Sequence, residues 1–182
     1  MSSRLCVAAY RWGSGRDREA AVVTLRSLRP DVVVLHRVPG HPFAGHRIAA
    51  FADHLDLMWS GGPHRRSGGT TVLTSLRLDA LDERHLSLGS SGHSGYAVTR
   101  LRLPGHPPCR VVGAHLAEPA GSAQLAELRA AVEGGGEPVV ALSCTAGAAV
   151  MADGWPGFAG AVVPVTDEVT STVVDLGTTL AT

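Results

Sequence analysis

Two arginines stand directly after predicted β-strands, where side chains from neighbouring strands can meet. Arg11 directly follows the apolar run 5–10, and Arg37 follows the β-branched run 31–35 after one intervening residue. We expect these strands to be neighbours, so both guanidinium groups would lie at one edge of a sheet. The planar fork of arginine suits a carboxylate, a phosphate or an enolate. The alternative is structural: each arginine pairs with a nearby acid such as Asp175.

Several of the nine histidines are placed where they could move protons or bind a ligand. His115 ends a predicted strand and has an ordinary pKa near neutrality, which suits a general acid or base; a half-buried ring satisfied by the backbone is the structural alternative. His36 follows a buried strand and either shares the same pocket or serves packing. His93 and Tyr96 belong to the Gly/Ser-rich segment 90–96, typical of a binding loop and equally of a plain hairpin turn.

The composition of the chain excludes several kinds of chemistry. The sequence has no lysine and no asparagine, and all sixteen basic residues are arginine. Schiff-base chemistry and the phosphate-loop lysine are therefore excluded. The formal charge is zero, which supplies no basic field for a polynucleotide, so we expect no nucleic acid partner. Three cysteines without a CxxC spacing indicate neither a disulfide framework nor a thiolate zinc site.

We expect a small-molecule ligand or substrate and no cofactor, while a partner protein or a homo-oligomer stays open. No apolar run approaches the roughly 20 residues that a membrane span requires. The first residues lack the apolar core of a signal peptide, so we expect a cytoplasmic protein without membrane partners.

The hydrophobic pattern predicts one α/β domain over residues 1–182, in which a strand–helix–strand unit is followed by consecutive strands and then by a helix and further strands. The predicted strands are 5–10, 31–35, 57–60, 68–75, 79–88, 95–103, 109–116, 138–142, 162–165 and 170–175. The predicted helices are 17–28, 46–55 and 119–132.

This order, together with several short phrases, resembles the endonuclease/exonuclease/phosphatase superfamily, which has the DNase I-like fold. The phrases are Ala9-Tyr10-Arg11, P-D-V-V-V-L-H-R-V at 30–38, G-G-T-T-V-L at 68–73, V-G-A-H-L at 112–116, V-V-A-L-S-C-T at 139–145 and V-D-L at 174–176. The resemblance spans nearly the whole chain. It implies a compact, loop-trimmed four-layer α/β/β/α sandwich.

At the positions that carry chemistry in this superfamily, the sequence departs from the pattern. The metal-binding glutamate falls on Arg37, the first asparagine on Arg11, the aspartate and asparagine of G-D-x-N on Ser143 and Thr145, and the final histidine on Leu176. Superfamily members use a divalent ion, usually Mg²⁺, which requires hard and preferably anionic oxygen ligands. A guanidinium cannot coordinate that ion and repels it. We therefore expect no metal site.

Two residues of the catalytic pattern remain, His115 and, in a less definite register, Asp175. The resemblance implies that an Asp175–His115 pair would orient and tune the imidazole, while Ser143 and Thr145 would line the same pocket beside the arginines.

These residues favour a metal-independent acid–base enzyme acting on a small organic, possibly anionic substrate by cyclisation, isomerisation, elimination or decarboxylation, as in bacterial specialised metabolism. The alternative is a non-catalytic pseudoenzyme that binds a ligand or a partner protein. A second alternative is residual Mg²⁺-dependent phosphodiesterase activity.

Overall fold

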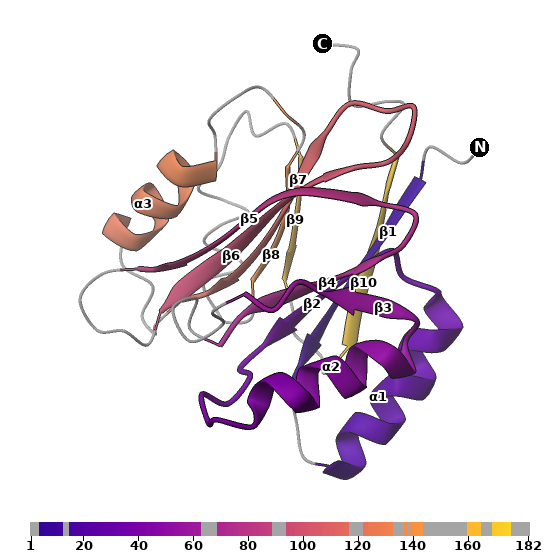
Figure 1. Ribbon diagram of the computed structural model, residues 1–182. Helices are drawn as coiled ribbons and strands as arrows, with labels where there is room; N and C mark the ends of the chain where they lie inside the picture. The colour runs from indigo at the N-terminus through magenta and orange to yellow at the C-terminus, as the bar shows by residue number, and fades with distance from the viewer. Residues whose placement is uncertain are drawn as a thin grey trace.

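The computed structural model shows two five-stranded sheets and three helices within the described residues (Figure 1). The described residues are 4–12, 15–62, 69–88, 94–116, 122–132, 137, 139–143, 160–164 and 169–175. Across these ranges, no helix has both the length and the apolar character needed to cross a membrane.

The first sheet has a parallel pair at its centre and antiparallel strands around it. Its order is β10 (Val169–Asp175), β1 (Arg4–Arg11), β2 (Val32–His36), β4 (Thr71–Ser75) and β3 (Leu57–Trp59). β1 and β2 are the parallel pair. β2 is buried at every residue, as its uninterrupted apolar sequence predicts for a strand covered on both faces.

The second sheet changes from antiparallel to parallel pairing along its width. Its order is β5 (Asp79–Ser87), β6 (Gly95–Arg102), β7 (Cys109–His115), β8 (Val139–Ser143) and β9 (Gly160–Pro164). The strands β5, β6 and β7 are antiparallel neighbours, whereas β7, β8 and β9 run parallel.

The helices cover the outer faces of the two sheets. Helix α1 (Gly15–Leu28) and helix α2 (Ala44–His54) share one hydrophobic core with the first sheet. Helix α3 (Ser122–Val132) lies against the second sheet, where Leu128 joins the core beneath it (Figure 1). The predicted four-layer α/β/β/α sandwich is therefore confirmed.

A third core lies between the two sheets, and strand alternation decides which side chains enter it. On β2, Val32 and Val34 face this central core, whereas Val33 and Leu35 pack beneath the helices. The next residue in the central row is His36. The last buried side chain of β2 on this face is thus a polar one, placed between the sheets.

Candidate functional site

The carboxyl ends of β1 and β2 meet at one edge of the first sheet, as the sequence predicts for neighbouring strands. Arg11 lies opposite His36 in the parallel register. The backbone N–H of Trp12 donates a hydrogen bond to the carbonyl oxygen of His36 over 2.8 Å. Strand pairing therefore places the end of β1 directly beside the buried histidine of β2.

His36 is the most unusual polar side chain at this edge. It is fully buried, and neither ring nitrogen has a hydrogen-bond partner among the residues that the structure describes. Burial, and to a smaller extent the neighbouring imidazole of His115, lowers the pKa of His36 to about 3. The ring is therefore neutral near pH 7, with one nitrogen as donor and the other as acceptor. A buried polar group without partners marks a place where a water or a ligand is expected.

His115 faces His36 from the second sheet. It ends β7 and continues the row of Val111 and Gly113 on the central face of that sheet, where it is half-buried. Gly113 makes the close approach possible, because a Cβ there would lie 2.7 Å from Cγ2 of Thr70 and 3.7 Å from Cε1 of His36. The His36 ring therefore lies against the β7 backbone, two residues before His115.

Arg11 and Arg37 are both exposed at the same edge. Neither makes an ion pair with any residue in the described parts of the chain. Arg37 has a φ of 58°, in the left-handed region, and the next backbone N–H, that of Val38, donates to Gly69. The backbone of Asp175 lies opposite Arg4, at the far end of β1 from Arg11, so the structural alternative of an Asp175 partner for these arginines is wrong.

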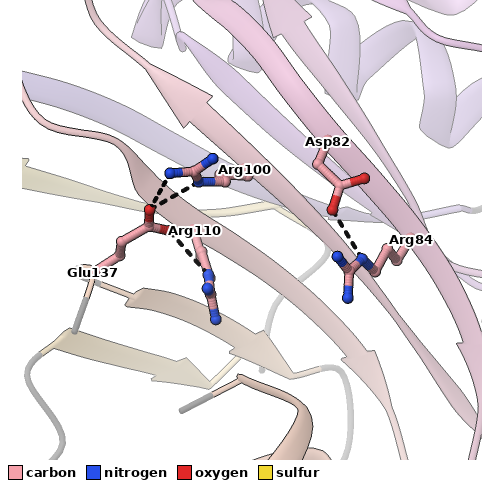
Figure 2. Close-up of polar contacts among 5 residues, drawn as sticks. All are labelled: Asp82, Arg84, Arg100, Arg110 and Glu137. Atoms are coloured by element: carbon pink, nitrogen blue, oxygen red, sulfur yellow. Dashed lines mark hydrogen bonds and ion pairs between the residues drawn. The ribbon is translucent and has the colours of Figure 1, made fainter. Parts of the chain in front are cut away.

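The arginines on the outer face of the second sheet are arranged differently (Figure 2). Arg100 donates to Oε1 of Glu137 from Nε and Nη2, over 2.8 and 2.5 Å, and Arg110 donates to Oε2 over 3.0 Å. Arg84 donates to Asp82 over 2.8 Å. The hydrogen bonds from Arg100 are the main reason that the pKa of Glu137 is lowered. Sequence reasoning missed this cluster, because Glu137 lies outside the strands and the two arginines that it joins face each other as like charges.

The predicted pair of His115 with Asp175 is wrong. β10 runs antiparallel to β1, and Asp175 lies opposite Arg4 at the far end of that strand. Arg4 precedes Arg11 by seven positions in β1, which corresponds to roughly 23 Å of extended chain. Asp175 therefore lies at the opposite end of the sheet and cannot orient the imidazole of His115.

Tyr96 does not share the space around His115 either, so that expectation also needs correction. Its side chain lies on the other face of the second sheet, in the core with Val112 and Leu128 beneath α3. Burial raises its pKa, as does the nearby carboxylate of Glu127. The cause is strand alternation, since Tyr96 pairs with Ala114 rather than with His115.

Three further predicted site residues are described only in part or not at all. The backbone of Ser143 ends β8 opposite Ala114, one residue from His115. The side chain of Ser143, together with Thr145 and His93, lies outside the described residues.

The four described side chains at this edge do not fit Mg²⁺. His36, His115, Arg11 and Arg37 offer two imidazoles and two guanidinium groups but no carboxylate, and Mg²⁺ prefers hard oxygen ligands. Over the described ranges, no three histidine, cysteine, aspartate or glutamate side chains are grouped to hold a metal ion. The same four side chains fit an anion, because the arginines supply positive charge and the imidazoles supply hydrogen bonds.

Solved structures with a similar arrangement of elements belong to the superfamily that the sequence resembles. ANGEL2, a 2',3'-cyclic phosphatase, has a TM-score of 0.58 and 13% identity over 82% of this chain and 55% of its own. A humanized D. rerio TDP2 has a TM-score of 0.52 and 16% identity over 71% of this chain and 58% of its own. TDP2 from C. elegans has a TM-score of 0.51 and 14% identity over 70% and 41%. The fold is DNase I-like.

The DNase I-like likeness is one of architecture. No family sequence profile matches this chain, and no curated protein matches it. The chain spans 41 to 58% of the length of the three DNase I-like proteins named above. The superfamily resemblance in the sequence phrases is therefore confirmed at the level of the fold, whereas the activity has to be argued from the side chains of this chain.

Proposed function

We propose that this protein is a metal-independent acid–base enzyme that acts on a small anionic molecule at the edge formed by β1, β2 and β7. Arg11 and Arg37 bind the anion, and His36 and His115 contact the reacting part of the substrate. The observation that carries the proposal is His36, whose two buried ring nitrogens have no partner among the described residues.

The two histidines have different roles because their surroundings differ. His36 stays neutral, since burial lowers its pKa to about 3, and it donates or accepts a hydrogen bond without gaining charge. His115 is half-buried at the end of β7, so it can exchange a proton with solvent. In the proposed reaction, a ring nitrogen of His115 takes a proton from the substrate or returns one.

The arginines support this chemistry by stabilising negative charge. Guanidinium groups are permanently charged and bind planar anions through two parallel hydrogen bonds. A fixed cation beside a bound carboxylate or phosphate also favours loss of a neighbouring proton, because it stabilises the resulting anion. Neither Arg11 nor Arg37 is engaged by an acid in the described ranges, so this charge is not neutralised in advance.

A non-catalytic ligand-binding protein is the second candidate, and one observation favours it. The acid that was expected to orient His115 lies at the far end of β1, opposite Arg4. The Asp175 carboxylate therefore does not orient that imidazole or assist it as a base. Under this alternative, the same four residues bind an anion but leave it unchanged.

Proton exchange in deuterated buffer separates the two candidates. We would incubate the protein, with EDTA present, with a panel of small 2-oxo acids and their phosphorylated counterparts, and follow by NMR the loss of signals from the C3 protons next to the keto group. Inorganic phosphate and adenosine 2',3'-cyclic phosphate serve as binding probes, the latter because one structural neighbour is a 2',3'-cyclic phosphatase. We expect exchange in the wild type, its loss in His115→Gln, and weaker anion binding in Arg37→Gln.

Arg29→Gln provides a matched control for Arg37→Gln. Arg29 is also exposed and also has a left-handed φ, of 50°, but it stands two residues before Asp31, at the amino end of β2. The variant Arg29→Gln should leave proton exchange and anion binding unchanged. Anion binding without proton exchange would support the non-catalytic candidate, and exchange that survives in His115→Gln would contradict the catalytic role. Stimulation of diester cleavage by Mg²⁺ would revive the phosphodiesterase alternative.

A further inference from the structure

A groove between α1 and α2 lies on the opposite side of the first sheet from His36. It has a volume of about 640 Å³ and opens to solvent between the two helices. Strand alternation separates it from the edge described above, because Trp12 packs in the core beneath the helices while Arg11, the residue before it, continues the row that faces the second sheet. The size suits one small organic molecule.

The inner wall of the groove is aromatic and rigid. Trp12 and Phe51 line it, with ring centroids 5.4 Å apart and planes inclined by 58°. Behind them, Tyr10 stacks on Phe51, with centroids 5.2 Å apart and an angle of 12°. All three rings are at least nine-tenths buried. This wall therefore offers an aromatic, apolar surface that is already fixed by the core.

The rim of the groove is basic. The guanidinium carbon of Arg18 lies 5.3 Å from the centre of the Trp12 ring. Arg47 lies across the groove, where its Nη1 lies 3.5 Å from Nε2 of His41, an exposed hydrogen bond. His54 donates its Nδ1 hydrogen to the Ala50 carbonyl oxygen over 2.5 Å, which leaves Nε2 for a ligand.

One acid, Glu19, also lines the groove. Within the described parts of the chain, it makes no ion pair with Arg18 or Arg47. The rim therefore keeps an excess of positive charge above an apolar wall. A ligand complementary to this arrangement is a small anion with a flat apolar body.

We propose that the groove between α1 and α2 is a second ligand site that binds an aromatic carboxylate. The ring of the ligand lies against Trp12 and Phe51, and its carboxylate accepts hydrogen bonds from Arg18 and Arg47. This site does not depend on the activity proposed for the His36–His115 edge. The two sites are nevertheless linked, because the Trp12 N–H donates to the His36 carbonyl oxygen over 2.8 Å.

NMR titration with 2-naphthoate tests the site directly. The chain has three tryptophans, so a ¹H–¹⁵N spectrum contains few indole signals, and Trp12→Phe assigns the one from Trp12. We expect 2-naphthoate to shift that signal saturably. The double variant Arg18→Gln/Arg47→Gln should weaken binding about tenfold, while Arg26→Gln should not, since Arg26 is exposed in the last turn of α1 and does not line the groove.

The neutral analogue 2-naphthamide keeps the test decisive even if the double variant is unstable. It has the same ring and lacks the charge, so the wild type should bind it several times more weakly than 2-naphthoate. Equal binding of the two compounds would overturn the proposal, because it would indicate simple apolar adsorption. An unshifted Trp12 signal at millimolar 2-naphthoate would overturn it as well.

Discussion

The arginines of the two sheets stand in opposite electrostatic settings. On the outer face of the second sheet, Arg100 and Arg110 share the carboxylate of Glu137 (Figure 2). At the edge of the first sheet, Arg11 and Arg37 have no acidic partner within the described residues. The first group of arginines forms ion pairs that link segments of the second sheet, whereas we propose that the second group binds a ligand.

This difference shows how one residue type serves two ends in a chain without lysine. A guanidinium that is paired with a carboxylate has a structural role, so its removal should lower the free energy of unfolding. A guanidinium without an acidic partner in the described residues, beside a buried neutral histidine, is proposed to bind a ligand, so its removal should weaken ligand binding.

The largest effect should come from acid. His36 has an ordinary pKa of 6.5 that the fold lowers to about 3, so the unfolded chain takes up a proton that the folded chain refuses. The free energy of unfolding should fall as the pH falls from 6.5 toward 3, by up to about 1.4 kcal/mol for each pH unit. Urea unfolding at a series of pH values measures this, and His36→Leu should flatten the slope.

The Glu137 cluster should respond in a separate and lower pH window. The pKa of Glu137 is lowered by Arg100 and Arg110, so its contribution is present above the ordinary carboxyl pKa and is lost as the pH falls through the lowered value. If His36→Leu leaves the slope between pH 6.5 and 5 unchanged, the assignment of that window to the histidine is wrong.

The second effect concerns the contact between the sheets beside His36. In Gly113→Ala, the new methyl group would collide with Cγ1 of Val34 and lie 2.7 Å from Cγ2 of Thr70. Overpacking of this kind should lower the free energy of unfolding by about 2 kcal/mol. Thermal or urea unfolding measures the loss, and the added substitution Val34→Ala should restore part of it. Full stability of Gly113→Ala would contradict the close approach.

The third effect is the loss of the ion pairs that Glu137 forms with Arg100 and Arg110. Glu137→Gln leaves Arg100 and Arg110 near each other without a carboxylate and should lower the free energy of unfolding by about 1 kcal/mol. A double-mutant cycle with Arg110→Gln measures the coupling. A cycle that closes with no coupling energy would show that this cluster contributes no more than scattered surface charges.

The smallest effect on stability should come from the unpaired arginines. Arg11→Gln and Arg37→Gln should each change the free energy of unfolding by less than about 0.5 kcal/mol. Calorimetric titration with phosphate should nevertheless show weaker binding in both. A large loss of stability in either variant would show that the arginine has a structural role rather than a ligand-binding one.

Local pattern was sufficient to predict most elements of this fold. The apolar run 5–10 and the helical stripe 17–28 correspond to β1 and α1, which extend a little further at residues 4–11 and 15–28. The runs 31–35 and 109–116 likewise correspond to β2 and β7 within one residue at each end. Hydrophobic periodicity is a short-range property, so it needs no knowledge of which strands pair.

The candidate site depended on pairing, and there the sequence was less informative. Asp175 was paired with His115 through the resemblance, but the antiparallel register with β1 places it beside Arg4. Alternation alone would have assigned Tyr96 to the helix-facing side, as it would have joined His36 to the row of Val32 and Val34. What no local rule supplies is the facing of His36 and His115, because it depends on how two separate sheets are stacked.

The backbone conformation of Arg37 is less favourable for an arginine than for a glycine. A non-glycine residue with φ near 58° sacrifices about 1 kcal/mol relative to glycine, and 22 glycines elsewhere show that this chain uses that residue freely. Arg37→Gly should therefore relax the main chain while deleting the charge. A variant that folds better and binds phosphate worse would show stability traded for recognition at a single residue.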